Sequence, residues 1–368
     1  MSKNIIISAT QLPFNGGAST VAYALIKYLR NNGHNSYGIF FNRSGGKADP
    51  YKYGQVYLIR TGITIYDKYN SKYDIDKDLD PNTIAKIKNE ISSPDIIICI
   101  GLHAPSYMRH MYPNTKIIMI TSGIILYKAF QNIKISIQEL LKNPSVFEKA
   151  KRTSFGKQDV EDMKVSDMII PNSPLMITIY NKIYPEYKYK ISDSFIDTSK
   201  FVEIFNANII QPIVEKDIDI IVVSSRLDRM EKNCAFLISI LKELNYKSCF
   251  IGSNNDAFKE ILNVILPNMI NHDELNNYYT RSKLLIVPSL YESSGNIIRE
   301  ALPHNCLILL SDNVGFYSSF PEISVCQTFN ENEWKDKIIY LIENYKDIIV
   351  DYKIKFNETY DILTLINL

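Results

Sequence analysis

The residues best suited to chemistry form one segment, YESSGNIIREAL, at positions 291–302. It follows an apolar run and leads into a helical stretch, which places Glu292 in a strand-to-helix loop. Gly295 lets a ligand approach the backbone closely, because glycine has no Cβ. Asn296 and Ile297 open the predicted helix with unsatisfied N–H groups. A helix N-terminus of this kind favours an anion such as a diphosphate.

Glu300 follows one turn further along the same predicted helix. A carboxylate there can accept hydrogen bonds from vicinal hydroxyls, as acidic residues do with ribose in dinucleotide-binding folds. The crevice outside the carboxyl ends of parallel strands is also where such sheets bind ligands. The alternative is that Glu292 and Glu300 are surface charges on an ordinary helix, and their spacing alone leaves both interpretations open.

The elements that must position these residues are short aliphatic runs separated by helical stretches. Near-continuous Ile, Val and Leu runs are typical of parallel strands buried on both faces, and alternation with helices implies right-handed βαβ crossovers. The predicted strands are residues 4–8, 37–41, 56–60, 95–101, 116–121 and 167–173 in the first half, and 219–225, 247–253, 283–289 and 306–312 in the second. We therefore predict an α/β chain with two doubly wound, Rossmann-like domains.

The length of 368 residues suits two such domains. The stretch between Asp197 and Asp219 has no clear periodicity, so we place the boundary there. The predicted domains are residues 1–205 and residues 206–345. The final segment, 346–368, is predicted to be helical and to pack back toward the first domain.

The order of the motifs resembles that of the retaining glycosyltransferases of family 4 and their relatives with the GT-B fold. The hallmark of that family, two Glu separated by seven residues and followed by a new strand, is matched by Glu292, Glu300 and the sequence ALPHNCLILLSD. The family's strand end with a basic residue, followed by Lys-Asn or Lys-Gly, is matched by SSRLDRMEKN, which supplies Arg226 and Lys232. The resemblance is most specific over residues 160–315, patchy over residues 10–40 and absent over residues 42–90.

This resemblance implies two domains facing a central cleft, with a nucleotide-sugar donor site in the second domain. It implies transfer of a hexose-type sugar from a UDP- or GDP-sugar co-substrate to a glycan, lipid or protein, with retention and with neither a cofactor nor a metal ion. Preorganised cations would stabilise the departing phosphate. The implied roles are leaving-group neutralisation by Arg226 and Lys232, ribose binding by Glu300, contact with the donor sugar by Glu292, and backbone contacts from Gly16, Gly17, Gly295, Asn296 and Ile297.

The chain departs from the family pattern at two places. Arg226 and Lys232 are six positions apart, where the resemblance leads us to expect five, although Lys232 still precedes the predicted helix NCAFLISILKEL directly. A His that relatives often carry near the reacting carbon is replaced by Ser122. His103, in GLHAPS, is the candidate substitute, and the alternative is a loop histidine without a role.

Two polar stretches admit other interpretations. The sequences DID (74–76) and DLD (78–80) match a pattern by which another glycosyltransferase fold holds divalent metals. They lie in a polar run with no strong strand before it, so we interpret them as a solvated loop. The Lys-rich stretch 128–157 is either a solvated helix face or a contact with anionic lipid or acidic glycan.

The composition limits the possible partners and surroundings of the chain. Lys and Arg total 41 and Asp and Glu total 40, a balance that argues against a nucleic-acid binder. The chain has five cysteines, and no pair of them has CxxC spacing. It also has no apolar run long enough for a signal peptide or a membrane span. We therefore predict a cytoplasmic protein. Two alternative functions stay open, a non-catalytic GT-B protein that binds nucleotide-sugar or glycan and a nucleotide-sugar epimerase.

Overall fold

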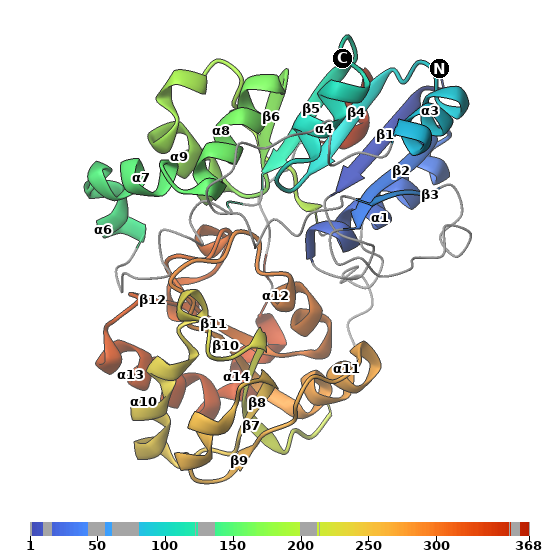
Figure 1. Cartoon of the computed structure of the whole chain (residues 1–368). Coiled ribbons are helices and arrows are strands. Elements are labelled where there is room, and N and C mark those ends of the chain that lie inside the picture. Colours follow the sequence, from blue (N-terminus) through green and yellow to red (C-terminus); the bar gives the residue numbers. More distant parts are fainter. Residues whose placement is uncertain are drawn as a thin grey trace. The chain divides into compact units, whose positions relative to one another are not determined.

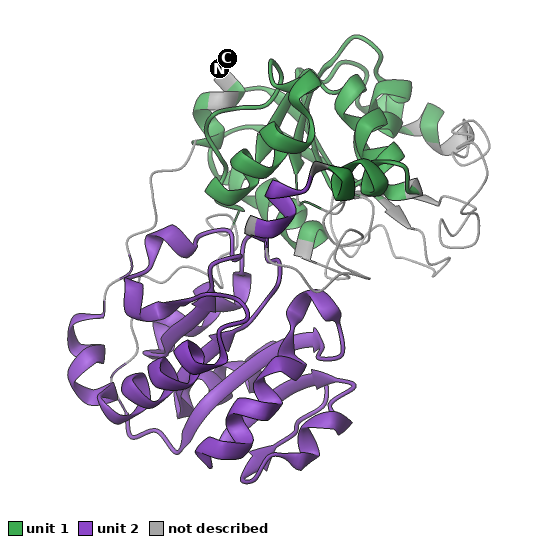
Figure 2. Cartoon of the chain, turned by 90° about the vertical axis from the view of Figure 1, so that its left-hand side faces the viewer, with its two compact units in different colours: residues 1–128, 144–203, 359–368 green, residues 129–143, 204–358 purple. Residues whose placement is uncertain are grey.

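The computed structural model describes residues 2–9, 17–42, 56–60, 81–121, 123, 137–198, 212, 214–352, 354 and 361–367. The chain divides into two compact units, shown in different colours in Figure 2. Unit 1 comprises Met1–Lys128, Pro144–Glu203 and Thr359–Leu368, and unit 2 comprises Ala129–Asn143 and Ile204–Glu358. Each unit is built around its own parallel sheet.

The described part of unit 1 contains a six-stranded sheet in the order β3-β2-β1-β4-β5-β6 (Figure 1). All neighbouring strands in it are parallel. The order reverses between β1 and β4, as in a doubly wound fold. The strands are β1 (Asn4–Ala9), β2 (Asn35–Asn42), β3 (Val56–Arg60), β4 (Ile96–Ile100), β5 (Lys116–Thr121) and β6 (Met168–Pro171).

The helices of unit 1 cover this sheet with apolar side chains. Ile6, Ile39 and Ile97 on neighbouring strands are fully buried in one cluster with residues of α3 and α4. In α1, Val21 and Leu25 lie four positions apart, and so on one face of the helix, and both are buried. The helices are α1 (Gly17–Asn31), α3 (Pro81–Glu90), α4 (Ala104–Met111), α7 (Pro144–Lys151), α8 (Ser154–Val165), α9 (Pro174–Ile183) and α15 (Ile362–Asn367).

The described part of unit 2 also contains a six-stranded parallel sheet, in the order β12-β11-β10-β7-β8-β9. Here the order reverses between β7 and β10. The strands are β7 (Ile218–Arg226), β8 (Ser248–Ser253), β9 (Val264–Ile265), β10 (Ser282–Val287), β11 (Leu307–Ser311) and β12 (Val325–Cys326). The two sheets confirm the predicted pair of Rossmann-like domains.

Both faces of the unit 2 sheet are covered by helices. Helices α10 and α13 pack on one face, where Trp334 is fully buried, and helices α11 and α12 pack on the other, where Ile298 is buried. The helices of unit 2 are α6 (Ile137–Lys142), α10 (Leu237–Leu244), α11 (His272–Arg281), α12 (Asn296–Ala301), α13 (Glu331–Glu343) and α14 (Tyr345–Asp351).

Residues 359–368, which contain α15, belong to unit 1, whereas residues 346–358 belong to unit 2. The Lys3 ammonium donates a hydrogen bond to the Ile366 carbonyl of α15. All ten predicted strands are present, whereas β9 and β12 were missed. Each of these two is a two-residue strand at a sheet edge, too short to form an apolar run. Among the described helices, none has the length and apolar character needed to cross a membrane.

Candidate active site

Unit 2 has a small pocket at the carboxyl ends of β7 and β10. These are the two neighbouring strands between which the strand order reverses, the position at which open α/β sheets bind ligands. Lys232 and Glu292 bring opposite charges to the pocket, and Ser224 and Ser289 add hydroxyl groups. The wall also includes Ile297, from the first turn of α12.

The Lys232 ammonium donates a hydrogen bond to a Glu292 carboxylate oxygen. Their side chains are 26% and 17% exposed, respectively, so the pair is shielded but reachable from the pocket. Burial lowers the pKa of Lys232, but attraction and hydrogen bonding from Glu292, with a further contribution from Glu231, raise it more, and the net pKa is raised. Lys232 is therefore a cation throughout the neutral range.

The backbone around Lys232 explains how it meets Glu292. Lys232 ends a short 3₁₀ turn (Met230–Lys232), and Asn233 follows in the left-handed region at φ 52°. The carbonyl of Glu231 accepts hydrogen bonds from the N–H groups of Leu290 at 2.8 Å and Tyr291 at 3.4 Å. These bonds join the 3₁₀ turn to the loop that carries Glu292.

The prediction that Lys232 directly precedes an α-helix is wrong. A second 3₁₀ turn, Cys234–Phe236, intervenes, and α10 begins only at Leu237. The left-handed conformation of Asn233 interrupts the helical path.

Arg226 is the last residue of β7, as predicted. Its guanidinium donates two hydrogen bonds to the Asp228 carboxylate, at 3.1 and 2.6 Å. The hydrogen bond from Arg226 is the main reason why the pKa of Asp228 falls to about 2. The Arg226 side chain is 53% exposed and does not line the pocket, so Lys232 is the cation among the described residues of the lining.

Helix α12 begins at Asn296, as predicted, after Gly295 in the left-handed region at φ 62°. A Cβ at Gly295 would lie 2.8 Å from Cδ1 of Ile298, so both the backbone and the packing favour glycine. The loop before it is held by the Glu292 backbone, whose N–H donates to the Asn313 carbonyl and whose carbonyl accepts from Gly315. This anchoring fixes the approach to the pocket.

Glu300, in the same helix, lies outside the pocket lining. Its carboxylate accepts a hydrogen bond from the buried Tyr279 hydroxyl at 3.1 Å. Burial raises the pKa of Glu300, while His272 and the Tyr279 hydrogen bond act in the opposite direction. Within the described residues, Nε2 of His272 is buried without a hydrogen-bond partner.

The remaining candidate residues predicted from the sequence belong to unit 1, and their positions are described within that unit. Gly17 is the first residue of α1, and Gly16 lies outside the described residues, as do Ser122 and the acidic motifs at 74–80. His103 precedes α4 with φ 69° and is buried. Its backbone N–H donates to the Asp162 carboxylate at 2.7 Å.

Sequence reasoning missed two buried acids of α8, Asp159 and Asp162. Two Asp three positions apart in a helix with three further charged residues resemble a solvated face. The sequence therefore carried no signal for their burial.

The comparisons with known proteins agree with this geometry. Residues 206–352 match the model of the family described as glycosyl transferases group 1. This segment includes Arg226, Lys232, Glu292 and Glu300. No curated protein matches the chain.

Solved structures show the same fold. Sucrose-phosphate synthase from Thermosynechococcus elongatus matches with a TM-score of 0.64 and 12% identity, over 94% of this chain and 90% of that one. HepE from Anabaena, solved with UDP-glucose, matches with a TM-score of 0.59 and 13% identity, over 94% and 91%. A glycosyltransferase from Rickettsia africae matches with a TM-score of 0.57 and 14% identity, over 95% and 94%.

The chain therefore has the GT-B fold, with two Rossmann-like domains. Its C-terminal part is a glycosyl transferases group 1 domain, and the chain is a glycosyltransferase. The prediction of a group 1 glycosyltransferase with the GT-B fold is thus confirmed, and membership of family 4 and retention stay predictions.

Proposed function

We propose that the chain transfers a hexose-type sugar from a UDP- or GDP-sugar to a glycan, lipid or protein acceptor in the cytoplasm, with retention at the anomeric carbon and without a divalent metal ion. The observation that carries the proposal is the pocket between β7 and β10, where Lys232 and Glu292 meet within the family segment. HepE, which shares the fold, was solved with UDP-glucose and with UDP and glucose.

In the proposed mechanism, the donor diphosphate binds beside Lys232. Negative charge grows on the phosphate oxygen as its bond to the sugar breaks, and a preorganised cation stabilises that charge. An ammonium has three N–H donors, so Lys232 can keep its bond to Glu292 and still donate to the phosphate. Its pKa, raised by Glu292, ensures that it carries the charge.

Glu292 has two proposed roles. It orients the Lys232 ammonium through their hydrogen bond, and its second carboxylate oxygen accepts a hydrogen bond from a hydroxyl of the donor sugar. Because its backbone is fixed by Asn313 and Gly315, the carboxylate is held in place before the donor arrives. Such positioning lowers the cost of reaching the reactive geometry.

The remaining assignments belong to the same proposal. Glu300 binds the ribose hydroxyls, and the first turn of α12 with Gly295, Asn296 and Ile297 offers backbone N–H groups. Arg226 assists Lys232 once its side chain leaves Asp228. Gly16, Gly17 and His103 are assigned to the first domain's side of the reaction.

A thermal-shift screen with UDP-, GDP-, ADP- and dTDP-sugars tests the proposal. A ligand at 100 times its dissociation constant stabilises a protein by about 2.7 kcal/mol, so the matching donor should raise the melting temperature clearly. Release of nucleoside diphosphate on addition of an acceptor extract would support transfer. Conversion of the sugar without any acceptor would instead support an epimerase, and binding without turnover would support a non-catalytic protein.

A further inference from the structure

The loop that carries Glu292, residues 288–295 and here called the donor loop, is bonded to Asn313, and Asn313 is bonded to a distant part of the chain. Asn313 follows β11 and is completely buried. Residues 129–143 lie in the sequence between β5 and α7, two elements of unit 1, yet they belong to unit 2 (Figure 2). They include α6, whose first residue, Ile137, is also completely buried.

The Asn313 side chain makes two hydrogen bonds, one through its oxygen and one through its nitrogen. Oδ1 accepts from the backbone N–H of Ile137 at 3.2 Å. Nδ2 donates to the hydroxyl of the buried Thr328, which in turn donates to the Asp312 carboxylate at 2.8 Å. An amide both accepts and donates, so Asn313 satisfies both neighbours at once, and an aliphatic side chain of similar size satisfies neither.

The backbone of Asn313 continues this chain of contacts to Glu292. The Asn313 carbonyl accepts from the Glu292 N–H at 3.2 Å, and the Gly315 N–H donates to the Glu292 carbonyl at 2.8 Å. These bonds belong to an isolated parallel bridge between Glu292 and Val314. A shift of Asn313 would therefore move the backbone from which the Glu292 side chain reaches Lys232.

We propose that Asn313 is a positioning residue for Glu292, and that it holds the donor loop in the arrangement in which Glu292 meets Lys232 only while α6 is bonded to its side chain. This inference rests on the proposed function for the role of Glu292 in transfer. It also adds a contribution from α6, which lies outside residues 206–352, the segment that matches the family.

Burial explains why the bond between Ile137 and Asn313 matters. Ile137 is the first residue of α6, and the first N–H groups of a helix have no partner within the helix. Asn313 supplies the missing acceptor. Because both residues are completely buried, water does not replace the bond when it is lost, and a buried polar group without a partner is costly. Loss of the bond therefore favours a shift of Asn313 and of the donor loop.

Two substitutions of Ile137 separate this hydrogen bond from the packing of the side chain. Ile137→Pro removes the N–H at the first position of a helix, where proline is tolerated. Ile137→Ala keeps the N–H and removes most of the buried side chain, so it is the matched control. Hydrogen-exchange mass spectrometry on the full chain measures the protection of the donor loop. We expect the loop to exchange about tenfold faster in Ile137→Pro than in the wild type, because it opens more readily, and Ile137→Ala to resemble the wild type.

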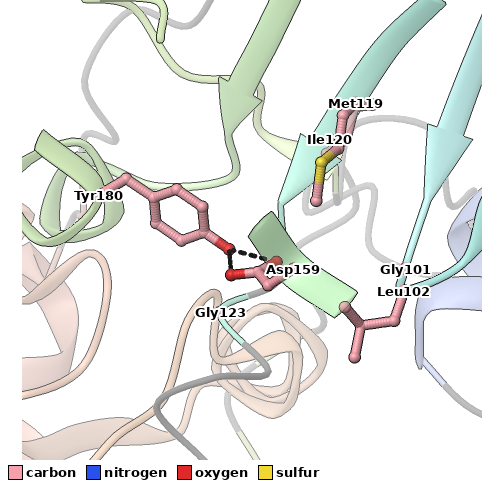
Figure 3. A pocket seen from close by; sticks show the side chains of 7 residues that line it. All are labelled: Gly101, Leu102, Met119, Ile120, Gly123, Asp159 and Tyr180. Carbon is pink, nitrogen blue, oxygen red and sulfur yellow. Dashed lines mark hydrogen bonds between the residues drawn. The ribbon is translucent and has the colours of Figure 1, made fainter. Parts of the chain in front are cut away.

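Asn313→Ala should also speed exchange of the donor loop, because it removes both side-chain hydrogen bonds. Tyr180→Phe controls for a loss of stability elsewhere in the chain. The Tyr180 hydroxyl lies 3.5 and 3.4 Å from the two oxygens of the buried Asp159 carboxylate in unit 1 (Figure 3), so its loss should leave the donor loop unchanged. If Asn313→Ala does not fold, the two Ile137 variants decide.

The consequence for transfer is measured with the UDP-, GDP-, ADP- or dTDP-sugar that gives the largest thermal shift. Asn313→Ala should lower kcat by about tenfold or more, because a small displacement of a group that contacts the donor slows the reaction. Affinity for the free nucleoside diphosphate should change less than kcat. In a Glu292→Ala background the same substitution should have little further effect on kcat, since it acts through Glu292.

The inference is overturned if the donor loop exchanges equally fast in Ile137→Pro and Ile137→Ala. It is equally overturned if Asn313→Ala lowers kcat as much in the Glu292→Ala background as in the wild type. Wild-type kcat in Glu292→Ala, together with faster exchange of the donor loop in Ile137→Pro, would count against the proposed role of Glu292 in transfer alone.

Discussion

Lys232 and Glu292 are 60 positions apart in the sequence and are joined by a hydrogen bond at the carboxyl edge of the unit 2 sheet. The loop after β7 carries the first residue and the loop after β10 carries the second. Strands β7 and β10 are adjacent in the sheet because the strand order reverses between them. The topology therefore brings the two charged side chains together.

Substitution of Lys232 should mainly lower kcat. The diphosphate gains charge as the bond to the sugar breaks, so a contact with it is stronger in the transition state than in the ground state. Lys232→Ala should lower kcat by a factor on the order of 10²–10³. Steady-state kinetics with the donor found by the screen would measure this.

Arg226→Ala is the informative comparison. The Arg226 side chain is half-exposed and donates hydrogen bonds to the Asp228 carboxylate. Its loss should therefore lower kcat less than the loss of Lys232. Equal kcat values for wild type and both variants would mean that the diphosphate binds elsewhere.

Glu300 should contribute to nucleotide affinity through ribose hydroxyls. Glu300→Ala should weaken UDP or GDP binding at least tenfold, because hydrogen bonds to a charged acceptor are worth about 1.5–3 kcal/mol. Calorimetry should also show that 2′,3′-dideoxy-UDP binds the wild type and the variant equally. A variant that binds UDP like the wild type would make Glu300 a structural partner of Tyr279 only.

Turnover should survive chelation, because Lys232 and the first turn of α12 are proposed to meet the diphosphate. The measurement is donor turnover before and after EDTA treatment. Loss of all activity with EDTA, restored by Mn²⁺, would contradict this and direct attention to Asp74 and Asp76, which lie outside the described residues.

The buried acid Asp159 should make stability depend on pH. Burial raises its pKa from 3.8 to about 6 in the folded protein, so the folded state binds more protons than the unfolded state between these values. The free energy of unfolding therefore falls as pH rises through this range, by up to about 1.4 kcal/mol per pH unit, and levels off above it.

Denaturant unfolding of the wild type and Asp159→Asn from pH 4 to pH 8 measures this contribution. In the variant, the free energy of unfolding should fall less steeply as pH rises. A part of the decline should remain, because burial also raises the pKa of Asp162, to about 7. Parallel curves for the two proteins would show that Asp159 does not titrate in this range.

The sequence predicted the fold well because the strands of a doubly wound sheet are buried on both faces. Runs such as Ile5–Ile7 are completely buried, as the strands inside such a sheet must be. The same logic failed for β9 and β12, which pair over only two residues each. Strands this short form by pairing with the edge of the neighbouring strand, and two residues are too few to show a hydrophobic pattern in the sequence.

The site was predictable only where it follows a motif. The sequence motifs placed Lys232 and Glu292 in loops after strands. The adjacency of β7 and β10 then brings their side chains together. The 3₁₀ turns around Asn233 and the pairing of Arg226 with Asp228 depend on local backbone geometry. Asp159 gave no signal, because its burial depends on α9 contributing Tyr180 and Tyr184.

The central claim is that the donor binds in the pocket between β7 and β10, and filling that pocket tests it most directly. Ile297→Trp adds bulk to the lining. Ile238→Trp makes the same change at a partly buried isoleucine of α10 outside the lining and serves as the control. Titration of the selected nucleotide sugar should show binding by the wild type and the control and a loss of at least tenfold in Ile297→Trp. Equal affinity in folded Ile297→Trp would contradict the account.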